Sequence, residues 1–233
     1  MKKPLIGINP YHIERKGSFW NATKEDYYST VWNSGGCPVT LNYPKKKEHI
    51  PNIVEHLHGL LMVGGPDLPA DVYGSTNPEL IDKDQMSKER EFFDREIFLE
   101  TLKQDKKVLA VCAGLQLINT VFGGTLTEDI PTLIPGAADH GTFNGEHSIH
   151  EVKIEKESKL FNVLGANSAS VASTHHQCVN RLGENIIPVA CSLDGVVEAI
   201  EIKNQKNFIG VQWHPELIKQ SEETKKLFSW LLS

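Results

Sequence analysis

Short apolar runs separated by helical stretches constrain the fold of this sequence more than any other feature. Seven runs have the length and residue types of β-strands, and several are continuously apolar instead of alternating with polar residues. Continuous apolar runs are typical of strands that are covered on both faces. We expect strands at residues 5–8, 38–41, 60–63, 108–112, 187–191, 196–202 and 208–213.

Helical patterns lie between several of these strands. Thr23 and Asp26 mark the start of a helix that ends at Gly35 and Gly36. Three more helices are expected, at residues 87–104, 114–122 and 221–232. Strands that alternate with helices predict an α/β fold, here a single domain over residues 1–233 with a central, mostly parallel sheet and helices on both faces. The second half is richer in strand, so some antiparallel strands are expected there.

The composition narrows the class of protein. The chain has 233 residues and a formal net charge of −6, which disfavours nucleic acid as a partner. No run approaches the roughly 18 apolar residues of a membrane span, and Pro10 ends the first apolar run too early for a signal peptide. The four cysteines form no C-x-x-C pair. We therefore expect a cytoplasmic protein with no membrane partner and no disulfide framework.

The segment "AVCAG", residues 110–114, places a cysteine where a buried strand ends and a helix begins. Strand, Cys, Gly and helix is the layout of a nucleophile elbow, in which a tight turn lifts the side chain out of the sheet. The positive end of the following helix favours the reactive thiolate. Because free cysteines are also common in cores, this segment alone leaves Cys112 open between packing and catalysis.

The segment "FIGVQWHPE", residues 208–216, offers a base and a group that can orient it. Strand alternation predicts that Gln212, His214 and Glu216 point toward one face. Glu216 would then hold the His214 imidazole in the correct tautomer and stabilise its charged form. An exposed strand end would also explain His-Pro-Glu, so the tripeptide alone is weak evidence for catalysis. The cysteine elbow elsewhere in the chain strengthens the catalytic interpretation.

The segment "LLMVGGPDLPADVYG", residues 60–74, runs from a buried strand into two glycines and a proline. Glycines after a strand leave backbone N–H groups uncovered, which suits an oxyanion hole. Gly-Gly-Pro would also form an ordinary turn. The position at another strand end favours the functional interpretation.

Together the three motifs resemble those of class I glutamine amidotransferases, which have a flavodoxin-like fold and a Cys-His-Glu triad. Within that superfamily the chain is most similar to the γ-glutamyl-γ-aminobutyrate hydrolase family (peptidase C26). The resemblance covers essentially the whole chain. It is carried by "YYSTVWNSGGCPVTLNYP", "GGPDLPADVYG", "GLQLINTVFGGTLTEDI", "STHHQCVNRLG", "DGVVEAIE" and "GVQWHPE".

The resemblance implies a role for each matching residue. Cys112 would be the nucleophile, His214 the base and Glu216 its orienting partner. The backbone N–H groups of Gly65 and Ala113 would form the oxyanion hole. Four further residues would contact the substrate: Gln116, His175, His176 and Gln177.

The implied reaction is hydrolysis of the γ-glutamyl amide bond of a γ-glutamyl-amine, such as γ-glutamyl-γ-aminobutyrate, in amine catabolism. A γ-glutamyl thioester forms on the cysteine, and glutamate and the amine are released. The expected partner is therefore a small-molecule γ-glutamyl substrate, with no cofactor and no metal. A homodimer is a plausible assembly because dimers are the commonest oligomers.

Two departures from the family pattern bear on the amine side of the substrate. The family elbow is G-x-C-R-G, whereas this chain has Ala110 in place of the first Gly and Ala113 in place of the Arg. The segment "DHGTF", residues 139–143, also lacks the basic residue that usually follows the His. Loops 10–22 and 67–87 are expected to line the pocket for the amine.

Three other functions fit part of the pattern. A glutaminase subunit that supplies ammonia to a synthase has the same triad, but usually carries His-Gln where this chain has Leu115 and Gln116. A catalytically inactive γ-glutamyl-binding protein would not need the three triad residues together. Metal catalysis is disfavoured because the spacing of the histidines fits no familiar zinc pattern. Those histidines are His140, His147, His150, His175 and His176.

Overall fold

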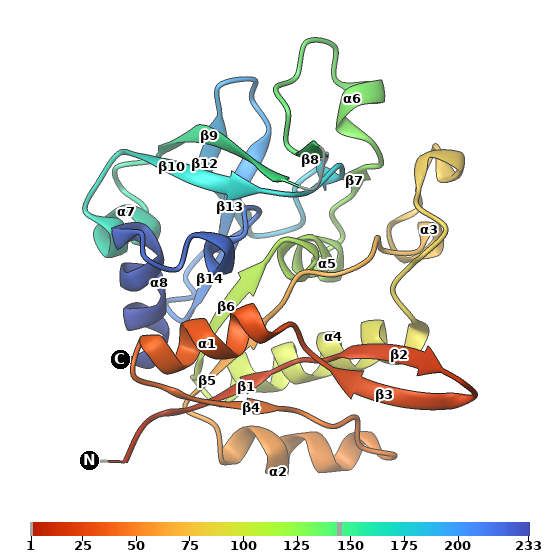
Figure 1. Ribbon diagram of the computed structural model, residues 1–233, viewed down its shortest axis with the longest axis vertical. Helices are drawn as coiled ribbons and strands as arrows, with labels where there is room; N and C mark the ends of the chain where they lie inside the picture. Colours follow the sequence, from red (N-terminus) through yellow and green to blue (C-terminus); the bar gives the residue numbers. More distant parts are fainter. Residues whose placement is uncertain (1, 144–145) are drawn as a thin grey trace.

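One β-sheet runs through the molecule, with its strands in the order β10-β9-β12-β13-β14-β6-β5-β1-β4 (Figure 1). The computed structural model describes residues 2–143 and 146–233. The parallel half contains β1 (Leu5–Ile8), β4 (Cys37–Thr40), β5 (Gly59–Met62), β6 (Lys107–Val111) and β14 (Phe208–Val211). The antiparallel half contains β13 (Val197–Ile202), β12 (Ile186–Ser192), β9 (Glu146–Ile154) and β10 (Ser168–Ser173), with the short β8 (Thr142–Phe143) pairing with β9.

Strand β5 illustrates how the sheet is covered on both faces. Leu60 and Met62 pack into one hydrophobic core, whereas Leu61 and the following Val63 pack into the other. The first core lies under α2 (Ile50–Glu55), α4 (Lys88–Lys103) and α5 (Ala113–Val121). The second lies under α1 (Glu25–Asn33), α7 (Lys159–Leu164) and α8 (Glu222–Leu232). The continuously apolar strands therefore form the middle of three layers.

The carboxyl ends of the parallel strands lie along one edge of the sheet. From β1 the chain goes first to β4 on one side and then to β5 and β6 on the other, so the strand order changes direction at β1. In open α/β sheets, ligands bind beyond the carboxyl ends of strands at such a switch point. The three sequence motifs follow β5, β6 and β14, so this topology brings them to the same edge.

Smaller elements lie outside the main sheet. The hairpin of β2 (Tyr11–Arg15) and β3 (Ser18–Ala22) projects from one side of the molecule (Figure 1). The strands β7 (Leu126–Thr127) and β11 (Cys178–Val179) form a separate pair. The short helical turns are α3 (Ala70–Tyr73), α6 (Ile130–Leu133), η1 (Lys47–His49), η2 (Pro78–Leu80) and η3 (Pro215–Ile218).

The predicted fold class is confirmed, and the predicted strands and helices are present with their ends within two residues of the expected positions. Residues 10–22, expected as a loop, form the β2–β3 hairpin instead. Strand β10 escaped prediction because its sequence, Ser-Ala-Ser-Val-Ala-Ser, consists mainly of small residues with weak strand propensity. Within the described ranges, no helix combines the length and the apolarity needed to cross a membrane.

Candidate active site

Cys112 occupies a strained turn between β6 and α5. Its backbone has φ of 50° and ψ of −113°, a conformation that is rare for any residue with a side chain. The Cys112 N–H donates to the Val211 carbonyl at 2.8 Å, and its own carbonyl accepts from the Gln116 N–H at 3.0 Å. A Cβ on Gly114 would lie 2.9 Å from the Met62 carbonyl oxygen, so only glycine lets α5 start this close to β5. This is the geometry of a nucleophile elbow.

His214 and Glu216 form a buried pair at the end of β14. The His214 Nδ1 lies 2.6 Å from Glu216 Oε1, and the His214 backbone N–H donates to Ala172 of β10 at 2.7 Å. Strand alternation was expected to bring Gln212, His214 and Glu216 to one face, and that reason for the pairing is wrong. Strand β14 ends at Val211, and the η3 turn that starts at Pro215 brings Glu216 back to the ring.

The protonation of His214 reflects its surroundings. Burial disfavours the charged ring, but the carboxylate of Glu216 and the thiol group of Cys112 outweigh it and raise the pKa of His214 to about 10. Nε2, the nitrogen that does not face Glu216, has no hydrogen-bond partner among the described residues. A ring with this environment can accept a proton from Cys112 and hold it as an imidazolium.

Gly64 lies where the elbow and the histidine meet. A Cβ at this position would fall 2.9 Å from His214 Cε1 and 3.3 Å from Cys112 Cβ, so a side chain would force the two apart. The Gly64 N–H donates to the Tyr27 hydroxyl at 3.1 Å. Burial and the neighbouring Glu216 carboxylate raise the pKa of Tyr27 well above its ordinary value, so this hydroxyl stays protonated. The first glycine of the Gly-Gly-Pro motif is thus required by packing around the site.

Arg90 fixes the orientation of the peptide between Gly64 and Gly65. Its guanidinium is buried, pairs with Asp94 at 3.1 Å, and donates through Nη2 to the carbonyls of Val63 at 3.1 Å and Gly64 at 2.9 Å. In a trans peptide the C=O and N–H point in opposite directions, so the Gly65 N–H points away from Arg90. Neither the Gly65 N–H nor that of Ala113 has an acceptor among the described residues.

Sequence reasoning missed Arg90 and Asp94, although a signal was present. They are spaced four apart on α4 and share a face with Phe93, Ile97 and Phe98, which are fully or almost fully buried. Two opposite charges at this spacing within an otherwise apolar face indicate a buried ion pair. Asn9 supports the pair, because its Nδ2 donates to Asp94 at 2.6 Å while its Oδ1 accepts from the Val63 N–H at 2.7 Å.

A cleft of about 1020 Å³ opens over these residues. Its wall includes Cys112, His214 and Gly65. As expected, parts of residues 10–22 and 67–87 also line it, namely 11–14 and 22 on the hairpin, Asp67, and residues 82 and 84–87. All four predicted substrate-contacting residues border the same cleft: Gln116, His175, His176 and Gln177.

These four residues differ in what they can offer to a ligand. Gln116 Nε2 donates to the Gln177 carbonyl at 3.1 Å and to Gln212 Oε1 at 3.3 Å, so its amide nitrogen is occupied by the protein. The His175 ring has Nδ1 at 3.0 Å from the Gln177 carbonyl and Nε2 at 3.6 Å from Glu198. Because both nitrogens face protein groups, we expect the His175 ring to shape the wall instead of binding substrate.

His176 lies between carboxylates at the side of the cleft. Its Nε2 is 3.0 Å from Asp67 and 3.8 Å from Asp82, and its Nδ1 is 3.1 Å from Asp129. The hydrogen bond to Asp67 is the largest influence, and with Asp129 and Asp82 it raises the pKa of His176 to about 9 against the effect of burial. The ring is therefore charged at neutral pH and holds three segments together.

Replacing His176 with Gln is expected to remove a pH-dependent part of the stability. The pKa of about 9 in the folded state lies above the ordinary value of 6.5, so the stabilisation is fully present below pH 6.5 and is lost as the pH rises through about 9. Chemical denaturation at several pH values measures it. The difference in free energy of unfolding between wild type and variant should shrink from pH 6.5 to pH 9. A difference that is constant over this range would contradict the ion pairs.

The chain is similar to known proteins over most of its length. The chain matches the family model Peptidase C26 over residues 4–216. It is 32% identical to the glutamine amidotransferase-like protein YvdE of Lactococcus lactis, over 96% of this chain and 96% of that protein. It is 26% identical to the γ-glutamyl-γ-aminobutyrate hydrolase PuuD of Escherichia coli K12, over 93% of this chain and 87% of that protein.

The fold is also found in a solved structure of low sequence similarity. The crystal structure of a protein described as a GMP synthase subunit, from Thermoplasma acidophilum, has a TM-score of 0.64 at 13% identity and covers 99% of this chain and 94% of that one. The family model spans the segments that carry Gly65, Cys112 and His214 and ends at Glu216. The protein therefore belongs to the peptidase C26 family of hydrolases and has the fold of class I glutamine amidotransferases.

Proposed function

We propose that the protein is a cysteine hydrolase that cleaves the γ-glutamyl amide bond of a γ-glutamyl-amine. The observation that carries this proposal is Cys112, held in a strained turn on the wall of the cleft beside a histidine that a buried carboxylate orients. A side chain held in an unfavourable backbone conformation at a cleft is typical of a nucleophile. Membership of a hydrolase family supports the same chemistry.

Acylation begins when His214 accepts the Cys112 thiol proton and the thiolate attacks the γ-carbonyl carbon. The new C–S bond leaves negative charge on the carbonyl oxygen, and the N–H groups of Gly65 and Ala113 stabilise that charge. His214 then donates its proton to the amine nitrogen, the C–N bond breaks, and a γ-glutamyl thioester remains. Water that loses a proton to His214 hydrolyses the thioester, which releases glutamate and restores the thiol.

Different segments of the cleft wall would contact the γ-glutamyl part and the amine part of the substrate. Gln116, His176 and Gln177 lie on the side of β11 and α5 and would meet the γ-glutamyl part. The β2–β3 hairpin and residues 82 and 84–87 form another part of the wall and would meet the amine. Ala113 stands where the family pattern has an Arg, so a cation next to the nucleophile is missing. We therefore expect the preferred amine to differ from that of relatives with the Arg.

Glutamate release from a panel of amides tests the proposal. The panel contains γ-glutamyl derivatives of anionic, neutral, cationic and aromatic amines, together with L-glutamine and matched α-glutamyl isomers. We expect release from at least one γ-glutamyl amide and none from its α-glutamyl isomer. Release from L-glutamine alone, and only with a partner synthase, would favour the glutaminase alternative instead.

If no amide in the panel is hydrolysed, a covalent probe distinguishes a panel that lacks the preferred amine from an incorrect mechanism. A γ-glutamyl diazoketone resembles the acyl part of the substrate and traps an activated cysteine irrespective of the amine. Peptide mass spectrometry should locate the adduct on Cys112 and not on Cys178, which is also buried. No adduct and no turnover together would overturn the proposal in favour of an inactive binding protein.

A further inference from the structure

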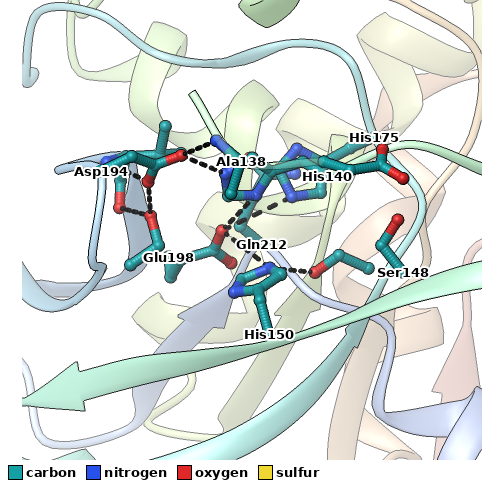
Figure 2. A network of polar contacts seen from close by, with 12 residues as sticks. Ala138, His140, Ser148, His150, His175, Asp194, Glu198 and Gln212 are labelled. Atoms are coloured by element: carbon teal, nitrogen blue, oxygen red, sulfur yellow. Dashed lines mark hydrogen bonds and ion pairs between the residues drawn. The ribbon is translucent and has the colours of Figure 1, made fainter. Parts of the chain in front are cut away.

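Three histidines surround a buried carboxylate (Figure 2), and one of them, His175, also lines the cleft. The Oε1 of Glu198 lies 3.0 Å from His140 Nδ1, 3.5 Å from His150 Nε2 and 3.6 Å from His175 Nε2. All four donor atoms lie within 4.8 Å of one another. Glu198 is 0% exposed, His140 2% and His175 6%, so these three side chains are shielded from water, whereas His150 is partly buried.

The outer nitrogen of each ring faces an oxygen that only accepts hydrogen bonds. His140 Nε2 is 3.0 Å from the Asp194 carboxylate, His150 Nδ1 is 3.4 Å from the carbonyl of Glu151, and His175 Nδ1 is 3.0 Å from the carbonyl of Gln177. In neutral His140 and His175 the proton therefore belongs on the outer nitrogen, and the same tautomer of His150 lets its Nε2 accept a hydrogen bond from the Ser173 hydroxyl. The inner nitrogen of each ring then carries a lone pair, and all three inner nitrogens point toward Glu198.

This arrangement leaves four of the inner atoms without partners. His140 Nδ1, His175 Nε2 and both carboxylate oxygens of Glu198 have no hydrogen bond within the described ranges, and all are buried. Lone pairs that face a carboxylate in a buried site are unfavourable unless a positive group lies between them. If His140 took up one extra proton, its Nδ1 could donate to Glu198 Oε1. The lone pair on His175 Nε2 would still face the same oxygen. A divalent cation would satisfy every inner atom at once.

The donor set and its spacing suit zinc. Imidazole nitrogen and carboxylate oxygen bind Zn²⁺ at about 2.0–2.2 Å, which places neighbouring ligands of a tetrahedron about 3.3–3.6 Å apart. The three contacts around Glu198, 3.0, 3.5 and 3.6 Å, lie close to this separation. Histidine ligands of metals usually donate their other ring N–H to a carboxylate or carbonyl, which is the arrangement of all three rings here. His150 Nε2 also lies 2.8 Å from Ser173 Oγ, a bond that metal binding would replace.

We propose that His140, His150, His175 and Glu198 form a structural site for one divalent transition-metal ion, with Zn²⁺ as the best match. Four protein ligands complete a tetrahedron and leave no open position, so the ion would stabilise structure and would not activate water. The ligands come from the segment before β8, from β9, from the segment after β10 and from β13, so one ion would join four parts of the antiparallel half.

A metal ion at this site would hold the part of the cleft wall around Gln116 in place. The Gln177 carbonyl accepts from both the His175 ring and Gln116, and the Glu198 carbonyl accepts from the Gln212 N–H at 2.7 Å. Gln212 in turn accepts from Gln116 through its side chain. Two routes thus connect the proposed ligands to a residue one helical turn after Cys112. This role is independent of the substrate and of the proposed reaction.

Zinc binding to the purified full-length protein tests the proposal directly. After treatment with a chelator and its removal, Zn²⁺ is titrated in competition with a chromogenic chelator, and the Tm is measured with and without one equivalent. We expect one Zn²⁺ per chain and a rise in Tm, because the ion binds only the folded state. Co²⁺ in place of Zn²⁺ should give the visible absorption of a four-coordinate site.

Matched variants assign the ligands. His150→Ala and Glu198→Gln should weaken zinc binding by about 100-fold or more and abolish the rise in Tm. His147→Ala changes an exposed histidine of the same strand and should bind as wild type does. Because His150 is only partly buried, its variant should fold even if Glu198→Gln does not, and circular dichroism checks this.

Either of two results would contradict the proposed metal site. Wild-type protein that binds no Zn²⁺, or binds it no more tightly than His150→Ala, would show that protons alone balance Glu198. Loss of zinc binding in His176→Ala but not in His150→Ala would place the ion instead at Asp67, Asp82 and His176, the other group with metal-binding geometry among the described residues.

Discussion

Replacing Cys112 with Ala is expected to lower the hydrolysis of γ-glutamyl amides by at least about 10⁴-fold, because no thioester can form. The oxyanion donors and the cleft remain in the variant, so substrate binding should persist while turnover is lost. Alanine is smaller than cysteine and introduces no new contact around Gly64, so the fold should be retained. Glutamate release under saturating substrate measures the effect, and circular dichroism confirms folding.

Cys191→Ala is the matched control for this experiment. Cys191 is a free, partly buried cysteine in β12, outside the cleft wall, and its loss should leave kcat within about twofold of wild type. Hydrolysis retained in Cys112→Ala but lost in Cys191→Ala would exclude Cys112 as the nucleophile. Equal loss in both would indicate a general effect of cysteine replacement on the fold.

Replacing Glu216 with Gln is expected to lower kcat by about 10²–10⁴-fold without removing any group that touches substrate. The carboxylate accepts from His214 Nδ1 at 2.6 Å, which leaves Nε2 free to take the thiol proton. A glutamine amide can donate to Nδ1 instead, which would place the ring proton on Nε2 and block proton transfer from Cys112. We therefore propose that Glu216 is a positioning residue, and the loss should appear mainly in kcat.

The pH profile distinguishes this role from a purely structural one. Glu216 helps to raise the pKa of His214 to about 10, so without its charge the pKa of His214 falls. The alkaline limb of kcat/KM, where the imidazolium is lost, should therefore move to lower pH in Glu216→Gln. Glu222→Gln, on the exposed first turn of α8, is the control and should keep the wild-type profile. A lower rate with an unshifted alkaline limb would contradict the positioning role.

The spatial convergence of the proposed catalytic residues could be predicted because each lies just beyond the end of an apolar strand. Cys112, His214 and Gly65 each follow a run that reads as buried, and parallel strands bring such positions to one edge. The pattern could not predict the backbone path after β14. Glu216 reaches the His214 ring through a 3-10 turn and not by strand alternation. Its role in orienting His214 is still a proposal.

The histidine cluster could not be predicted because its geometry depends on long-range pairing. The sequence suggested His140, His147 and His150 as the nearest candidates, and no metal was expected. In the structure, β9 pairs with β10 so that His150 lies opposite Val171, while His147 remains exposed. Glu198 comes from a third strand, β13, and carried no signal as a ligand. Register and strand order, which a single sequence does not reveal, decide which side chains meet.

The position of β14 has a consequence for how the molecule folds. It follows all the other described strands in the chain, yet it lies in the interior of the sheet between β6 and β13. The strands on either side, β6 and β13, therefore cannot become part of one continuous sheet until β14 pairs with both. Contacts between residues so distant in sequence form slowly. His214 arrives with that strand, whereas Cys112 comes about one hundred residues earlier. A newly synthesised chain thus carries an unpartnered thiol until the final step of assembly, so its proposed hydrolytic activity would begin only once the sheet is complete.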